Sequence, residues 1–262
     1  MSEYDNIVVD REGAVAHVTL DSESRMNGIT HDLCAELLHA VTDLGEDPDV
    51  RCLTLSGSGD AFCAGADLSM LAGDGSDAPE IRRLASKLHD VVLQLHQIEK
   101  PCVVGVNGVA AGAGFGLALA GDIVVMSADA RLEYAYPRIG FTGDGGSTFL
   151  LPRLVGLRRA KEIALLDEPI DPDYAVSLGL VTESVPAEEF EERLNEQSQR
   201  LAEGPTAAMG ATKRLLAESF DRDLAQQLAE ETDAMATAAK SEDFQRGYDA
   251  FFSKEDPDFV GR

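Results

Sequence analysis

Two short segments rich in small residues carry the strongest chemical signal in the chain. They are residues 61–68 (AFCAGADL) and 106–116 (VNGVAAGAGFG), and each follows a run typical of a buried strand. Loops of small residues leave backbone N–H groups uncovered, and two such groups aimed at one oxygen form an oxyanion hole. The two loops together therefore predict chemistry on a carbonyl group, with an acid or a base close by.

An alternation of strands and helices must position these loops. Hydrophobic runs predict strands at 7–10, 14–20, 51–55, 102–106 and 122–126. Helical spacing predicts helices at 30–44, with Thr30 as the N-cap, and at 81–98. From residue 187 onward the spacing is helical throughout, with helices expected at 187–202, 206–218, 223–238 and 242–252. This order predicts an α/β core followed by a helical C-terminal region.

The chain is strongly acidic. Its 262 residues include 47 Asp and Glu against 22 Lys and Arg, which gives a net charge of −25. Such a charge disfavours binding to nucleic acids, whose phosphates repel acidic surfaces. Because salt screens the self-repulsion of the folded chain, we expect adaptation to high salt. The alternative is an ordinary acidic protein of the cytoplasm.

Neither the N-terminus nor the cysteines indicate export or a metal site. The first residues are polar and acidic, which excludes a signal peptide of the usual kind. The uncharged stretch 101–121 is too rich in glycine for a membrane span, and a buried strand, loop and helix explain it better. The cysteines show no zinc-like spacing, so we expect reduced, buried thiols in the cytoplasm and no metal. They are Cys34, Cys52, Cys63 and Cys102.

A dinucleotide site is the first rival interpretation of the second loop. Residues 112–116 (GAGFG) are rich in glycine and follow a strand. The dinucleotide fingerprint G-x-G-x-x-G needs a third glycine, and Leu117 stands in its place. We therefore do not expect a nicotinamide or flavin cofactor.

The segments together resemble the crotonase, or enoyl-CoA hydratase/isomerase, superfamily along nearly the whole chain. Besides the two loops, the matching segments are 25–29 (RMNGI), 100–108 (KPCVVGVNG), 151–156 (LPRLVG), 175–181 (AVSLGLV), 212–213 (TK) and 247–252 (GYDAFF). The resemblance implies a spiral of strand–strand–helix repeats over 1–200 and a helical trimerisation region over 201–262. It also implies an acyl-CoA thioester as substrate, no further cofactor, and a homotrimer or a dimer of trimers.

The resemblance also implies a set of site residues. The backbone N–H groups of Ala66 and Ala113 would form the oxyanion hole, and both residues are small enough to let a thioester oxygen reach the main chain. Residues expected along the coenzyme A path are Arg25, Gly28, Ala64, Asp67, Leu68 and Gly112. Phe251 and Lys254 lie in the C-terminal helix, which in this family can complete the pocket of a neighbouring subunit.

The acid or base separates the branches of the family. Its hydratases use two glutamates, but Gly116 occupies the first position and residues 134–138 (YAYPR) offer no carboxylate for the second. Glu133 is the only nearby rival for it. In isomerase branches an Asp or Glu stands just before Gly-Gly, and Asp144 matches it. One carboxylate suffices to move a proton from one carbon to another. The alternative role of Asp144 is to cap the helix that starts near Gly146.

The sequence favours an acyl-CoA isomerase of the Δ3,Δ2-enoyl or phenylacetate ring-epoxide type, with Asp144 as its base. Two alternatives are an enoyl-CoA hydratase that uses Glu133 or Asp144 with a water, and a non-catalytic acyl-CoA-binding paralogue. The histidines lie outside the loops, so we attribute them to packing and expect no Ser-His-Asp hydrolase. They are His17, His31, His39, His89 and His96.

Salt dependence tests the interpretation of the acidic composition. Because molar salt screens repulsion among the excess carboxylates, we expect the melting temperature to rise steadily as KCl is raised to molar concentrations. Thermal unfolding followed by circular dichroism measures this. A melting temperature that stays constant or falls over that range would contradict salt adaptation.

Overall fold

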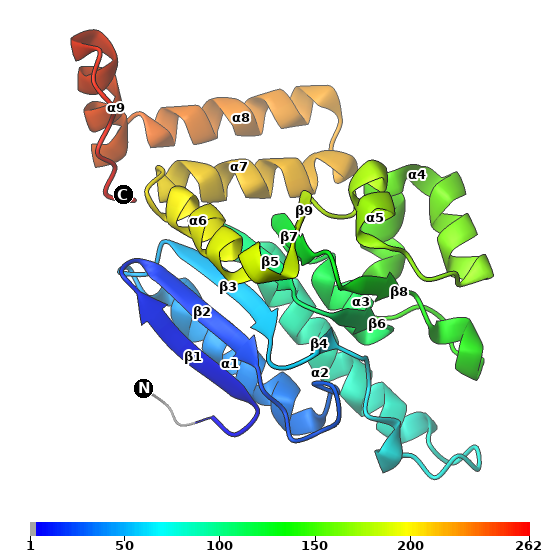
Figure 1. The fold of residues 1–262 in the computed structure, drawn as a ribbon. Helices are drawn as coiled ribbons and strands as arrows, with labels where there is room; N and C mark the ends of the chain where they lie inside the picture. Colours follow the sequence, from blue (N-terminus) through cyan, green and yellow to red (C-terminus); the bar gives the residue numbers. More distant parts are fainter. Residues whose placement is uncertain (1–3) are drawn as a thin grey trace.

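The larger sheet of the computed structural model, which describes residues 4–262, contains six strands. Its order is β1-β2-β3-β5-β7-β9, with β1 and β2 antiparallel and the others parallel (Figure 1). The strands are β1 (Ile7–Glu12), β2 (Val15–Leu20), β3 (Cys52–Gly57), β5 (Cys102–Val106), β7 (Ile123–Ser127) and β9 (Glu183–Val185). The five strands expected from the sequence are all present in it.

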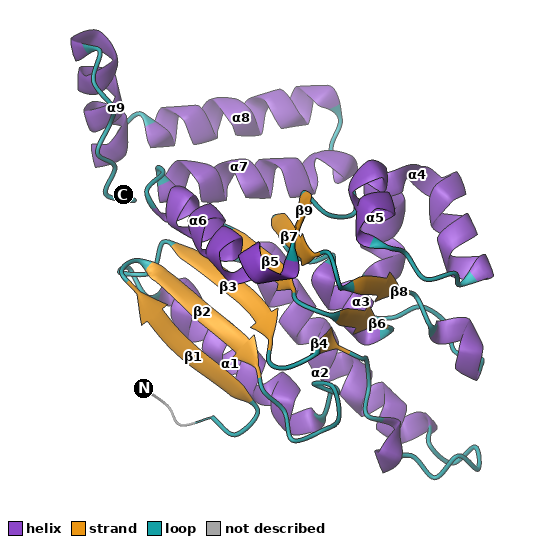
Figure 2. Ribbon diagram, in the orientation of Figure 1, coloured by secondary structure: helices purple, strands orange, loops and turns teal. Residues whose placement is uncertain are grey.

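A second, three-stranded parallel sheet carries the strands that lead into the two glycine-rich loops. It consists of β4 (Ala61–Cys63), β6 (Val109–Ala111) and β8 (Arg131–Glu133), in the order β4-β6-β8. From β3 onward, each repeat places one strand in the large sheet, the next in the small sheet, and then a helix (Figure 2). This is the strand–strand–helix spiral expected from the resemblance. It brings the ends of β4 and β6 side by side.

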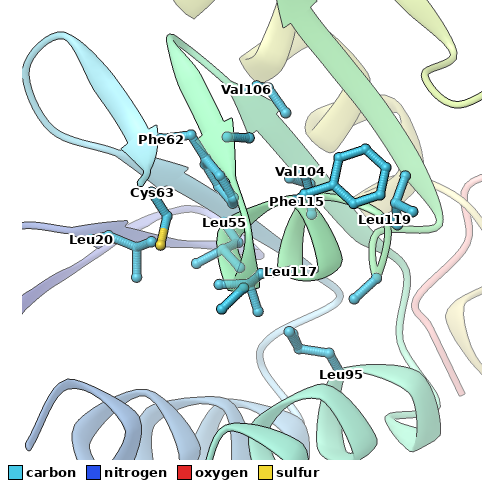
Figure 3. Packing of buried hydrophobic residues seen from close by; sticks show 14 of the residues in the cluster. Leu20, Leu55, Phe62, Cys63, Leu95, Val104, Val106, Phe115, Leu117 and Leu119 are labelled. Atoms are coloured by element: carbon cyan, nitrogen blue, oxygen red, sulfur yellow. The ribbon is translucent and has the colours of Figure 1, made fainter. Parts of the chain in front are cut away.

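Helices α1 (His31–Glu46), α2 (Ala78–Gln97) and α3 (Ala113–Ala118) bury their apolar faces in the main core. Thr30 caps α1 as expected, since its Oγ1 accepts a hydrogen bond from the amide of Leu33 at 3.1 Å. Phe62 in β4 and Phe115 in α3 are both fully buried (Figure 3). Two fixed aromatic side chains therefore anchor the beginning of the first loop and the end of the second.

The rest of the chain is largely helical. The remaining helices are α4 (Ser147–Leu166), α5 (Pro172–Leu178), α6 (Phe190–Ala202), α7 (Thr206–Glu218), α8 (Leu224–Ala238) and α9 (Glu242–Ser253). Phe190 and Leu194 of α6 pack with Val103 and Val125 on the other face of the large sheet. Helices α7 and α8 run alongside each other, and α9 projects beyond them (Figure 1). Within residues 4–262, no helix combines the length and apolar character that spanning a membrane requires.

Candidate active site

The two loops of small residues, 61–68 and 106–116, meet where β4 and β6 end. A Cβ atom on Gly65 would lie 2.9 Å from the carbonyl oxygen of Ala111 and 3.4 Å from the amide nitrogen of Ala113. Gly112 has φ +54° and ψ −118°, a backbone conformation that side chains disfavour. Glycine at both positions lets the loops approach each other through their main chains.

Two backbone amides of these loops have no hydrogen-bond partner among the described residues. Ile29 pairs with the first loop through Gly65 and Asp67, at 2.8 and 3.0 Å, and the amide of Ala66 between them stays unpaired. Ala113 is the first residue of α3, so its amide has no partner within the helix. Among the described residues, neither amide donates a hydrogen bond. Two free N–H groups therefore stand on adjoining loops, as an oxyanion hole requires.

Both amides border a cavity of about 640 Å³. Seven of the residues expected from the sequence line it together: Ala64, Ala66, Asp67, Leu68, Gly112, Ala113 and Asp144. Large apolar side chains form much of the remaining wall: Ile81, Leu84 and Leu88 of α2, and Tyr136, Ile139 and Phe141 from the segment before Asp144. The cavity thus combines polar main-chain groups with an apolar compartment, as small-molecule sites do.

Asp144 is held by a histidine and not by a helix terminus. Its Oδ1 is hydrogen-bonded to Nε2 of His89 on α2. Its side chain is 31% exposed, and Oδ2 has no partner among the described residues. Helix α4 begins after Gly146 without a side-chain cap, so the alternative of Asp144 as a capping side chain is wrong. The carboxylate is therefore available in the cavity.

The sequence does not identify His89 as a site residue, because packing of helices and strands accounts for the histidines. In the structure it lies 55 residues from its partner Asp144, on a different element. No local motif connects the two residues. Only the packing of α2 against the 143–146 turn brings them together. A Cβ atom added at Gly145 would lie 3.5 Å from the side chain of Leu88 on that helix.

The structure explains why position 116 has no carboxylate. A Cβ atom on Gly116 would lie 2.2 Å from the carbonyl oxygen of Gly145. The turn that carries Asp144 therefore occupies the space that a side chain at 116 would need. The same turn lies against the second loop, because a Cβ on Gly145 would be 3.2 Å from the carbonyl oxygen of Ala113. Glycine at 116 and the turn that carries Asp144 thus belong to one packing arrangement.

Glu133 is engaged elsewhere. Its carboxylate accepts hydrogen bonds from Nε of Arg131, at 2.5 Å, and from Arg138. Burial alone would raise its pKa, but the two guanidinium groups outweigh that effect and hold the pKa below its usual range. Glu133 also does not line the cavity. It is therefore a structural ion-pair partner and a poor base.

The other acidic side chains in the cavity wall are less suited to proton transfer near neutral pH. Hydrogen bonds from Ser69 lower the pKa of Asp67, and the bond with His31, at 2.5 Å, lowers that of Glu80. Burial raises the pKa of the Tyr136 phenol far above neutral. Asp67 and Glu80 therefore stay ionised near neutral pH, and Tyr136 stays protonated.

The remaining predicted residues lie outside this cavity. Arg25 is exposed in the segment beside the first loop, where the amide of Ala64 donates to the carbonyl of Met26 at 3.0 Å. Gly28 is buried in the same segment, with no room for a Cβ beside Ser24. Phe251 and Lys254 lie at the end of α9 and do not line the cavity of their own chain.

The comparisons with known proteins agree with this geometry. Residues 10–262 match the family model described as enoyl-CoA hydratase/isomerase. The chain is 34% identical to the 1,2-epoxyphenylacetyl-CoA isomerase of Escherichia coli, covering 96% of this chain and 97% of the relative. It is 30% identical to the crotonyl-CoA hydratase of Syntrophomonas wolfei, covering 99% of each.

Solved structures lead to the same family. An enoyl-CoA hydratase from Bacillus anthracis superposes with a TM-score of 0.93 at 30% identity, over 98% of this chain and 100% of that one. An enoyl-CoA hydratase from Mycobacterium smegmatis gives a TM-score of 0.90 at 27% identity, over 97% and 98%. The chain belongs to the enoyl-CoA hydratase/isomerase family and has the crotonase fold.

The packing at position 116 makes a stability prediction. Gly116→Ala places a methyl group against the Gly145 carbonyl, so we expect a loss of about 1–3 kcal/mol in the free energy of unfolding. The control is Gly247→Ala in α9, where a Cβ would meet only the ring of Phe259, at 3.2 Å. Urea unfolding measures both variants. Equal stability of Gly116→Ala and the parent would contradict the packing described.

Proposed function

We propose that this chain is an acyl-CoA isomerase in which Asp144 is the only catalytic carboxylate. The amides of Ala66 and Ala113 hold the thioester oxygen, and negative charge accumulates there as an enolate forms. Oδ2 of Asp144 takes a proton from a carbon of the acyl chain, and the electron pair of the broken C–H bond enters the enolate. The same carboxyl then returns the proton to another carbon, which shifts the double bond.

The observation that carries this proposal is that the cavity has a carboxylate at position 144 and no space for one at position 116. Position 116 has no room for a side chain because the Gly145 main chain fills it, and that main chain belongs to the turn that presents Asp144. Glu133, the rival for the second hydratase position, does not line the cavity, and its carboxylate is paired with Arg131 and Arg138. One free carboxylate beside two free amides suits proton transfer within the substrate better than addition of water.

The names of the E. coli relative, an epoxyphenylacetyl-CoA isomerase, and of the S. wolfei relative, a crotonyl-CoA hydratase, support a ring-bearing or enoyl thioester as the substrate of this chain. Apolar side chains of α2 and of the Tyr136–Ile139 turn surround the part of the cavity next to Asp144, so an apolar acyl group fits there. We place the coenzyme A portion along Ala64, Asp67 and Leu68, toward the segment of Arg25 and Gly28. Coenzyme A is then part of the substrate, and no separate cofactor is needed.

We further propose that the chain forms a homotrimer, alone or as a dimer of trimers, through its C-terminal helices. Helix α9 exposes four aromatic side chains, and Phe251 and Phe252 remain 76% and 66% exposed. The other two are Phe244 and Tyr248. Such a contiguous aromatic face is costly in water and is typical of an interface between subunits. In the trimer, Phe251 and Lys254 would reach the coenzyme A path of the neighbouring subunit.

The catalytic proposal predicts the behaviour of Asp144→Asn. Because an amide does not accept the substrate proton, we expect turnover of a 3-enoyl-CoA to fall by about 10²–10⁴-fold. The matched control is Glu80→Gln, which removes the other cavity carboxylate bound to a histidine and should retain most of the activity. Formation of the conjugated 2-enoyl-CoA is followed by its absorbance.

Three outcomes of that assay would contradict the proposal. Full turnover by Asp144→Asn would exclude the single-base mechanism. Rapid loss of absorbance with crotonyl-CoA, faster than any isomerisation, would indicate a hydratase instead. Tight binding of acyl-CoA without turnover of 3-enoyl or ring-epoxide thioesters would indicate a non-catalytic binding protein.

The trimer proposal has its own test. In light scattering, the parent chain should have the mass of three or six subunits of 28.0 kDa. The double variant Phe251→Asp, Phe252→Asp places two charges in the proposed interface, so we expect dissociation into single subunits. Val8→Asp on β1 replaces an exposed apolar residue of the sheet edge and is the control. A monomeric parent chain would refute the proposal.

A further inference from the structure

The interaction between His89 and Asp144 goes beyond what a single-base isomerase requires. His89 lies within α2, and its side chain is 54% exposed. Its Nε2 is hydrogen-bonded to Oδ1 of Asp144, but His89 itself does not line the cavity. The imidazole therefore contacts the base from outside and has no direct access to the acyl group.

The turn around Asp144 gives the carboxylate little other support. Gly143 precedes it, and Gly145 and Gly146 follow it with φ of +58° and +74°. Packing against α2 and α3 holds the main chain of this turn, but the glycines on either side provide no side chain that could hold the Asp144 carboxylate. The Asp144 carboxylate does not cap α4, and its only side-chain hydrogen bond among the described residues is with His89.

We propose that His89 is a positioning residue that fixes Asp144 for proton transfer, an inference that rests on the proposed isomerase function. An ionised carboxylate only accepts hydrogen bonds, so Nε2 must carry the hydrogen and donate it to Oδ1. Oδ2 then remains free for the substrate. When Oδ2 holds the substrate proton, Oδ1 is the carbonyl oxygen of a carboxylic acid and still accepts from Nε2.

Holding the carboxylate affects rate more than binding. Proton abstraction requires the base to sit within hydrogen-bond reach of the C–H group, and displacement by about 1 Å can cost about 100-fold in rate. Since His89 does not border the cavity, its loss leaves the substrate contacts in place. Substitution of His89 should therefore lower kcat and leave KM unchanged.

Two amide substitutions distinguish positioning from a general structural role. His89→Gln carries an amide N–H at about the reach of Nε2, so it can still donate to Oδ1. His89→Asn carries its amide only as far as Nδ1 and cannot reach it. We expect kcat to fall about 10- to 100-fold in His89→Asn with KM within about twofold, and to stay within about fivefold of the parent in His89→Gln. His96→Asn, on the same helix beside Phe149, is the matched control.

A double-mutant cycle with Asp144→Asn completes the test. If His89 acts through Asp144, then His89→Asn should reduce the residual rate of Asp144→Asn by less than about twofold. Equal losses in His89→Gln and His89→Asn, a change confined to KM, or additive losses in the cycle would overturn the role. An inactive Asp144→Asn beside a fully active His89→Asn would overturn this inference alone, whereas an active Asp144→Asn would overturn the isomerase proposal too. Melting temperatures equal to that of the His96→Asn control show that the variants are folded.

Discussion

The candidate site depends on main-chain segments that touch without side chains between them. A Cβ atom on Gly114 would lie 2.0 Å from the carbonyl oxygen of Cys63, and one on Gly116 would lie 2.2 Å from that of Gly145. A Cβ atom on Gly65 would lie 2.9 Å from the carbonyl oxygen of Ala111. Three segments that are distant in sequence therefore share one small volume. Side chains at these glycines would push them apart and separate the amides from the carboxylate.

This packing also decides which polar groups are available for chemistry. The loops that meet in this way carry Ala66 and Ala113, which line the cavity and whose amides have no partner among the described residues. Because the 143–146 turn fills the space beside α3, a carboxylate fits at 144 and not at 116. The glycines that make this possible provide no neighbouring side chain to hold the Asp144 carboxylate. His89 supplies the missing restraint from α2.

Local patterns predicted much of the fold, and the family resemblance indicated Ala66 and Ala113 as the main-chain part of the site. The apolar runs identified the strands of the large sheet except β9, and helical spacing identified α7 over Thr206–Glu218 to the residue. The three-residue strands β4, β6 and β8 were not predicted, because tertiary pairing creates them and no period of two develops in so short a run. His89 escaped prediction for a similar reason, since only the packing of α2 brings it to Asp144.

The central claim is that two amides and one carboxylate converge on a single thioester. A crystal structure with a slowly reacting acyl-CoA bound tests it most directly. We predict the thioester oxygen at about 3 Å from the amide nitrogens of Ala66 and Ala113, with Oδ2 of Asp144 facing the acyl carbons that exchange the proton. A thioester oxygen that contacts neither amide, or an acyl chain directed away from Asp144, would contradict the account.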